Sequence, residues 1–271
     1  MATITNILAK YVKNPSKGHI EAAKRILRYL KGTHTKGITF STSPQSQIDS
    51  FLKFPLDPSS ITALADANWG PQDQSRPLPS KRYPDLELFK SRSLSGFIIM
   101  GHGPIHWMSK RQSLTARSSA EAEIIATDEC TKFLLYLRNV SLDLNIATLL
   151  FPSATILYND NAACVKWAKN MTTKGLRYIQ IRENAVRESI LNDFIHVKHI
   201  AGKINLADLF TKEDKDCAHF LTIRDLLVQD APKYIPRASD ISSVQGGCQP
   251  KPSSQVGTRQ LNCPFTSHNI T

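Results

Sequence analysis

Four carboxylates occupy positions where an acidic side chain is unexpected. They are two aspartates that each close an apolar, strand-like run, a third at the start of a helical segment, and a glutamate on an apolar helix face: Asp66, Asp160, Asp208 and Glu123. A single aspartate at a strand end is usually a turn residue or a helix cap, and that alternative applies to each one taken alone. Two strand-end aspartates followed by a third acidic residue on a helical segment favour a shared site.

The helix expected from Ser118 to about Asn145 offers two glutamates, Glu121 and Glu123. Ser118 and Glu121 form a capping-box pattern, which explains Glu121 without a site. Glu123 shares a helical face with residues expected to pack on a sheet: Thr127, Cys130, Leu134 and Leu137. The face of Glu121 is expected to be wetter and contains Ile125, Asp128, Lys132 and Asn139. A carboxylate on the packed face needs a cation or hydrogen bonds to offset its desolvation, so Glu123 is the stronger candidate.

Carboxylates gathered at one end of a sheet repel one another unless a cation neutralises them. Hard oxygen ligands without an accompanying cysteine and histidine cluster suit Mg²⁺, with Mn²⁺ as the alternative. Two such ions about 3.5–4 Å apart are a common device for in-line cleavage of phosphodiesters. The chemistry expected of this set is therefore metal-dependent hydrolysis of a nucleic-acid backbone.

A mixed α/β domain over residues 58–229 is expected to position these carboxylates. Strands are predicted at residues 60–66, 95–100, 105–109, 154–160 and 194–200. Helices are predicted at 118–145, 161–169 and 179–192, and a further helical segment begins near Leu206. A long proline-rich loop is expected at 71–92. Antiparallel strands come first, and the later strands alternate with helices.

Residues 1–50 are basic, with eight Lys and Arg against two acidic residues, a net charge of +6 out of +11 for the chain. One amphipathic helix is expected from Ser16 to Leu30. Its apolar side contains Ile20, Ala23, Leu27 and Leu30, and its other side carries three cations: Lys24, Arg28 and Lys31. These cations are either a solvated helix face or a contact with phosphates. Residues 230–271 are rich in Pro, Ser, Gly and Gln, and we expect a disordered tail there.

The composition limits the class of protein. The 271 residues are 41% apolar and 21% charged, which predicts a packed core. The sequence has no run of 18 apolar residues, and its start lacks the long apolar stretch of a signal peptide, so we expect neither a membrane span nor secretion. Five scattered cysteines without a C-x-x-C pair suit a reducing compartment rather than disulfides or zinc, and Cys130 and Cys164 are expected to be buried. We expect a soluble intracellular protein of the cytoplasm or nucleus.

Five stretches, in order, resemble the ribonuclease H region of copia-type retrotransposon Pol polyproteins. They are LADANWG (64–70), SRSLSGFIIMGHGPIHWMSKRQ (91–112), SSAEAEIIAT (118–127), ILYNDNAACVKWAKN (156–170) and INLADLFTK (204–212). Upstream, residues 14–40 are similar to the segment that links the reverse transcriptase to ribonuclease H. The resemblance covers about residues 5–228 and identifies residues 1–50 as a remnant of that connection segment.

The resemblance implies an α/β fold with a ribonuclease H-like mixed sheet, in which three antiparallel strands precede parallel ones and helices flank the sheet. It implies that two Mg²⁺ ions are held by Asp66, Glu123, Asp160 and Asp208, the last of these opening the final helix. The implied activity is endoribonucleolytic cleavage of the RNA strand of RNA–DNA hybrids. Ser95, Lys110, Arg111 and the basic helix are expected to contact the nucleic-acid backbone. Integrases share the fold but use an Asp-Asp-Glu order, which this sequence does not match.

Several departures from the family favour an alternative, a catalytically inactive or co-opted remnant that binds nucleic acid only. Asn68 stands where the family commonly has a second aspartate, and the family's Lys-His-Ile-Asp-Ile-Arg reads Arg-Tyr-Ile-Gln-Ile-Arg at 177–182. His199 lies near the position of a mobile-loop histidine but one residue out of register; an ordinary strand-end histidine is the alternative. The paired aspartates of a polymerase are absent, so the missing polymerase portion of Pol is an expected partner.

Overall fold

The computed structural model describes residues 2–9, 11–40, 46–56, 60–69, 93–170, 180–212 and 217–230. The expected loop at 71–92, the 177–179 part of the altered motif and nearly all of the expected tail at 230–271 lie outside the described residues. All the described residues belong to one compact unit. The boundary predicted between residues 1–50 and 58–229 stays a prediction.

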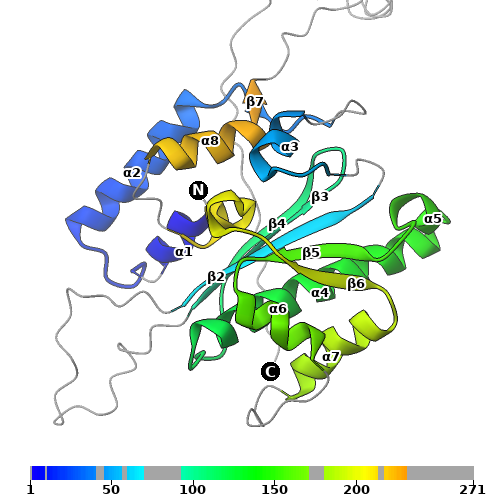
Figure 1. The fold of residues 1–271 in the computed structure, drawn as a ribbon. Coiled ribbons are helices and arrows are strands. Elements are labelled where there is room, and N and C mark those ends of the chain that lie inside the picture. Colours follow the sequence, from blue (N-terminus) through cyan, green and yellow to red (C-terminus); the bar gives the residue numbers. More distant parts are fainter. Residues whose placement is uncertain are drawn as a thin grey trace, which may run out of the picture. The chain divides into compact units, whose positions relative to one another are not determined.

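A five-stranded mixed sheet forms the centre of this unit (Figure 1). Its spatial order is β4-β3-β2-β5-β6. The first three strands are antiparallel: β2 (Thr62–Asn68), β3 (Leu94–Met100) and β4 (Pro104–Arg111). The last two are parallel to β2: β5 (Thr155–Asn159) and β6 (Ile195–His199). The expected ribonuclease H-like arrangement of strands is confirmed.

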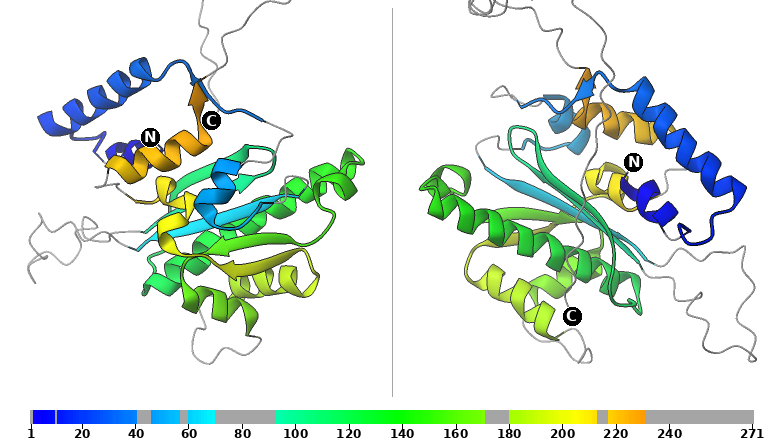
Figure 2. Two further views of the ribbon diagram at one scale, coloured as in Figure 1. Left: turned by 45° about the horizontal axis from the view of Figure 1, so that its top comes forward. Right: turned by 180° about the vertical axis from the view of Figure 1, so that it is seen from behind.

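Both faces of the sheet are covered, which is why β3 is buried along its whole length (Figure 2). One face packs on α4 (Ser119–Asp143), α6 (Ala162–Lys169) and α7 (Gln180–Leu191), with the short α5 (Ala147–Leu150) at the end of α4. The other packs on α3 (Ser46–Leu52), the 3-10 helix η3 (Leu206–Phe210) and α8 (Cys217–Leu227).

Alternation along the strands divides the core into two clusters. Ala65 and Phe97, opposite each other on β2 and β3, belong to the cluster under α4. Leu64 and Ile98, the next pair, belong to the cluster under η3 and α8. Asp66 is two residues beyond Leu64, so it shares the face that η3 covers.

Two helices lie between Ala2 and Gly32, where one was expected. α1 (Ala2–Ala9) is anchored to the sheet side, because the Thr3 hydroxyl donates to the Leu209 carbonyl at 2.8 Å and the Asn6 amide donates to the Ser109 carbonyl. The expected basic helix is confirmed as α2 (Lys17–Gly32), capped by Ser16. A small two-stranded sheet pairs β1 (Lys36–Gly37) with β7 (Gln229–Asp230).

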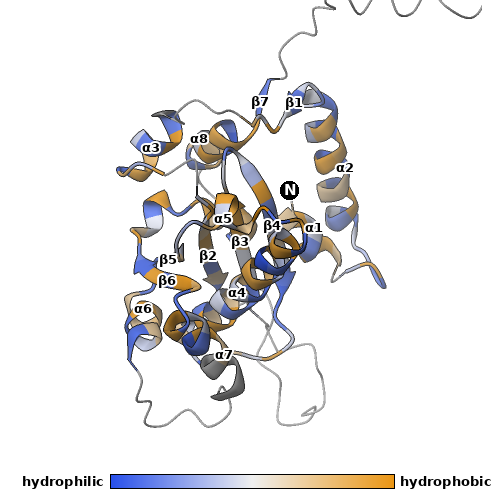
Figure 3. Ribbon diagram, turned by 90° about the vertical axis from the view of Figure 1, so that its right-hand side faces the viewer, coloured by the Kyte–Doolittle hydropathy of each residue, from blue (hydrophilic) through white to orange (hydrophobic). Residues whose placement is uncertain are grey.

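The apolar side of α2 remains largely exposed: Ile20 by 46%, Leu27 by 65% and Leu30 by 51%. Figure 3 shows apolar and polar residues both present along this helix. Amphipathic patterning therefore predicted the helix correctly, but none of its residues is buried. Within the described residues, no helix combines the length and apolar character that a membrane span requires.

Two expectations about helices need correction. The face of Glu121 is not uniformly wet, because Ile125 and Asp128 are both buried; Lys132 forms an ion pair with Asp128 at 2.7 Å and offsets its burial. Asp208 does not open the final helix, since it lies on the five-residue η3, and α8 begins only at Cys217. The prediction that Cys130 and Cys164 are buried is confirmed.

Candidate metal centre

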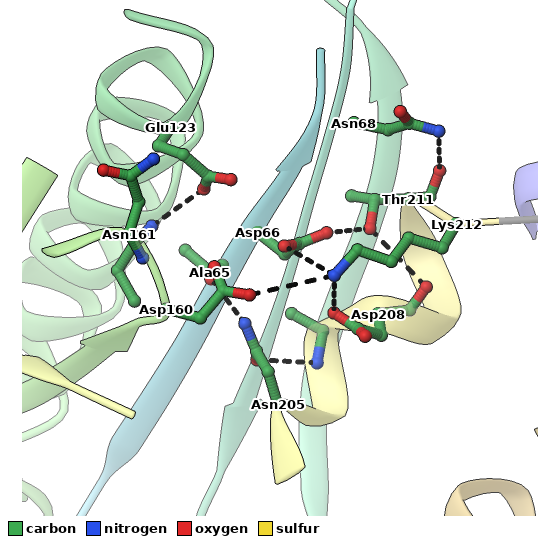
Figure 4. A network of polar contacts seen from close by, with 12 residues as sticks. Ala65, Asp66, Asn68, Glu123, Asp160, Asn161, Asn205, Asp208, Thr211 and Lys212 are labelled. Carbon is green, nitrogen blue, oxygen red and sulfur yellow. Dashed lines mark hydrogen bonds and ion pairs between the residues drawn. The ribbon is translucent and has the colours of Figure 1, made fainter. Parts of the chain in front are cut away.

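Three of the four predicted carboxylates converge at one end of the sheet (Figure 4). Asp66 lies near the end of β2, and Asp160 directly follows β5. The two strands are parallel neighbours in which Ala65 pairs with Asn159, so their register places the two aspartates side by side. Glu123 reaches the same point from the start of α4. Oxygen atoms of these three carboxylates all lie within 4.8 Å of one another.

Asp208 approaches from η3, on the other side of Asp66. Asn205 caps η3, accepting from the Ala207 backbone amide at 3.1 Å, and it donates to the Ala65 carbonyl at 3.1 Å. The cap therefore ties η3 to the β2 residue that precedes Asp66. Thr211, just beyond η3, donates its hydroxyl to Asp66. These contacts position Asp208 next to the other carboxylates.

Lys212 lies among the aspartates. Its Nζ is 2.7 Å from Asp208 Oδ1, 3.4 Å from Asp66 Oδ1 and 3.8 Å from Asp160 Oδ2. Burial lowers the pKa of Lys212, but attraction to Asp66 and Asp208 outweighs it, and the pKa is raised above its usual value. Lys212 thus offsets part of the negative charge on the η3 side of the cluster.

Glu123 has no ion pair within the described part of the chain. Its Oε2 accepts a hydrogen bond of 3.0 Å from the amide of Asn159, which is itself fully buried. Burial, followed by repulsion from Asp66, raises the pKa of Glu123 to about 9. The carboxylate is therefore poorly neutralised by the protein.

The pKa values of two aspartates are raised for similar reasons. Burial raises the pKa of Asp66, with Lys212 opposing the change. Burial and repulsion from Asp66 raise the pKa of Asp208 to about 7. A nearby multivalent cation stabilises the ionised form of such buried carboxylates. Hard oxygen donors, close together and short of positive charge, fit a divalent metal ion.

Glu121 lies outside the cluster, as the helical periodicity predicted. Its backbone amide donates to the Ser118 hydroxyl at 3.1 Å. Its carboxylate accepts a hydrogen bond of 2.7 Å from the Arg117 backbone amide. In a complete capping box it would accept from the backbone amide of the cap residue, Ser118. Glu121 therefore stabilises the start of α4 and does not face Asp66.

The residues predicted to contact nucleic acid are not gathered in one place. Lys110 and Arg111 are exposed at the end of β4, the same end of the sheet as Asp66. Ser95 is only 2% exposed and its hydroxyl accepts from Gln112, so this arrangement leaves it no surface for a direct contact. On α2, the cations are partly paired: Glu21 lies 2.8 Å from Lys24 and 3.8 Å from Arg28.

Two departures from the family have local structural roles. The Asn68 amide donates to the Thr211 carbonyl at 3.2 Å, a contact that an aspartate could not donate. Asn68 therefore helps to hold the residue that binds Asp66. His199 ends β6 and its Nε2 lies 3.1 Å from the Asp160 carbonyl oxygen. This contact favours the alternative in which His199 is an ordinary strand-end histidine.

Sequence reasoning missed the residues that support the carboxylates. Asn205, Thr211 and Lys212 all lie within or beside the INLADLFTK stretch, and the four-residue spacing of Asp208 and Lys212 was an available signal. Two glycines also approach the centre. A Cβ at Gly202 would lie 2.8 Å from Asp160 Oδ2, and one at Gly96 would lie 2.6 Å from the Thr211 side chain. No local pattern indicates these close approaches.

Comparison with known proteins places the chain beside transposon polyproteins. No protein-family model matches it. It is 29% identical over 210 residues to the retrovirus-related Pol polyprotein from transposon RE1 of Arabidopsis thaliana, covering 76% of this chain and 12% of that protein. It is 28% identical over 214 residues to the corresponding polyprotein from transposon TNT 1-94 of Nicotiana tabacum, covering 78% and 14%. The expected resemblance to copia-type Pol polyproteins is confirmed, and the chain spans about one eighth of their length.

Among solved structures, the chain is similar to a ribonuclease H1 isolated from compost. The two are 14% identical, the match covers 56% of this chain and 93% of that one, and the TM-score is 0.39. At that score the likeness is weak, and the sheet order described above is the stronger indication of the fold.

Proposed function

We propose that the chain is an endoribonuclease that cleaves the RNA strand of RNA–DNA hybrids by two-metal phosphodiester hydrolysis, as part of a retrotransposon reverse transcriptase. The observation that carries the proposal is the convergence of carboxylates from β2, α4, β5 and η3 at one end of the sheet. Metal-assisted hydrolysis of a phosphodiester needs such a set of oxygen ligands in a fixed arrangement.

Asp66, Glu123, Asp160 and Asp208 would hold the metal ions. Bound divalent ions supply charge stabilisation and a more acidic water molecule at the scissile phosphate. The protein's own contribution is to fix the ligands. Asn159 orients the Glu123 carboxylate, and Thr211 orients that of Asp66. Such outer hydrogen bonds commonly change metal affinity about 10–100-fold when removed.

Cleavage of a labelled RNA–DNA hybrid in Mg²⁺ or Mn²⁺ tests the proposal directly. We expect product from the hybrid but not from double-stranded DNA, and we expect the activity to fall to background in Asp66→Asn. A parent chain that binds hybrid without cleaving it in either metal would overturn the enzymatic proposal. The alternative, a co-opted remnant that only binds nucleic acid, would then replace it.

The α2 cations are proposed to contribute to binding of the hybrid. Replacing Lys24, Arg28 and Lys31 together with glutamine is expected to weaken binding and to flatten its dependence on salt, because each phosphate contact releases counterions. Two of these cations also neighbour Glu21, so the loss should be smaller than three full contacts. Affinity measured against salt concentration checks this. An unchanged slope would assign the cations to a solvated helix face.

The polymerase portion of Pol remains the other proposed partner. The relatives extend far beyond the region that matches this chain, and the exposed apolar residues Ile20, Leu27 and Leu30 on α2 are suited to a protein contact.

A further inference from the structure

We propose that Lys212 is a tethered cation that holds one of the two metal positions until a metal ion displaces it. This inference rests on the proposed metal-dependent function. The carboxylate cluster then contains two metal positions. One is open to a metal ion, and the other is already neutralised by Lys212.

The two positions share Asp66 and Asp160 but differ in their third carboxylate. On the α4 side, Asp66, Glu123 and Asp160 have oxygens within 4.8 Å of one another, and Glu123 has no cationic partner among the described residues. On the η3 side, Asp66, Asp160 and Asp208 all lie within ion-pair distance of Lys212 Nζ. Figure 4 shows Lys212 reaching between these three aspartates, with no contact drawn from it to Glu123.

Charge explains why the two positions should bind ions with different affinity. Once a divalent ion has displaced the Glu123 proton, the four ionised carboxylates carry four negative charges, of which Lys212 offsets one. A divalent ion on the α4 side adds two positive charges and leaves one negative charge. A second ion therefore meets little net attraction while the ammonium remains, and it is repelled by that ammonium at short range. Departure of Lys212 removes both obstacles.

The surroundings of Lys212 allow it to leave. Its side chain is 39% exposed, whereas the aspartates it contacts are 1%, 16% and 9% exposed. A cavity of about 520 Å³ between α1, α2, η3 and α8 is lined by Lys212 together with Ile4, Leu209 and Phe220. The aliphatic stem can move along this cavity while the ammonium turns to solvent. A displaced ammonium at this point would be available to a phosphate.

Titration with Mn²⁺ alone, without nucleic acid, tests the inference. For the parent chain we expect calorimetry to show two bound Mn²⁺ ions, one with higher affinity than the other. For K212M we expect the second dissociation constant to fall at least about tenfold, because a like charge has been removed from the site. K132M is the matched control, since Lys132 also pairs with an aspartate four residues earlier at 2.7 Å but lies outside the cluster. A second affinity in K212M equal to that of the parent overturns the inference.

A measurement on the parent chain covers the case in which K212M does not fold. Amine labelling read by mass spectrometry should show Lys212 reacting faster when Mn²⁺ saturates both positions, while Lys132 is unchanged. Labelling of Lys212 that does not respond to Mn²⁺ overturns the displacement. These measurements distinguish failure of the proposed nuclease activity from failure of the proposed Lys212 displacement. Two bound ions without hybrid cleavage would overturn the nuclease and leave the displacement standing; cleavage with unresponsive Lys212 labelling would do the reverse.

Discussion

Glu123→Gln is expected to abolish metal-dependent cleavage of the hybrid while preserving the fold. The substitution keeps the shape of the side chain and can still face the Asn159 amide, but it removes the charge that would hold a metal ion beside Asp66 and Asp160. Cleavage rates in Mg²⁺, with circular dichroism of the same preparation, measure both parts of the result.

Glu121→Gln is the matched control, two residues earlier on the same helix. Its side chain serves the Arg117 backbone amide, and a glutamine oxygen can accept the same hydrogen bond. We expect it to retain most activity and to lose at most about 1 kcal/mol of stability. An inactive Glu121→Gln beside an active Glu123→Gln would show that the two glutamates have been assigned the wrong way round.

The pH dependence of stability gives Glu123→Gln a second readout without nucleic acid. The folded metal-free protein keeps the Glu123 proton up to a pKa of about 9, whereas the unfolded chain releases it near 4.5. The unfolded state binds fewer protons across that window, so stability should fall as the pH rises through it and level off on either side. The Gln variant lacks this contribution. By pH 8.5 its free energy of unfolding should exceed that of the parent by at least about 1 kcal/mol. Thermal melts in EDTA from pH 5 to 8.5 test this; parallel curves would contradict it.

Gly96→Ala is the substitution expected to damage both fold and site by packing alone. A Cβ there would lie 2.6 Å from the Thr211 side chain, 2.7 Å from Phe210 Cβ and 3.1 Å from the Phe210 carbonyl carbon. Because one neighbour is backbone, η3 must shift away from β3. We expect a loss of about 1–3 kcal/mol, which is typical of overpacking, and weaker Mn²⁺ binding because Asp208 moves with η3.

Gly37→Ala provides the comparison for Gly96→Ala. Apart from its two chain neighbours, no described residue has an atom within 4 Å of a Cβ built at Gly37, and the residue belongs to the small β1–β7 sheet. Urea unfolding of both variants should show a clear loss for Gly96→Ala and little change for Gly37→Ala. Equal stabilities would mean that η3 accommodates the added methyl group and does not depend on contact with Gly96.

The sequence predicted the parts of the centre that periodicity controls. Apolar runs placed Asp66 and Asp160 at strand ends, and helical spacing separated Glu123 from Glu121. These inferences depend only on periods of 2.0 and 3.6 residues, which are local. The metal roles of the four carboxylates stay predictions.

The parts that could not be predicted depend on tertiary contacts. The short helices α1 and α3 carry weak patterns of their own and are held by packing. Lys212 acquires three partners only because η3 folds back onto β2. Burial of Asp128 is another such case, since helical periodicity alone places it on the wetter face of α4. The burial of Ser95 against Gln112 is a third case, because residues 17 positions apart meet there and the local sequence does not indicate it.

The hydrogen bond from Thr211 to Asp66 joins residues 145 positions apart in the chain. During synthesis, β2 leaves the ribosome long before η3 exists, so a nascent chain carries Asp66 without Thr211, Asp208 or Lys212. Contacts of such long range form slowly, because closing a long loop costs entropy before the contact is made. We therefore expect the proposed nuclease to be inactive until η3 has been synthesised and has packed against β2.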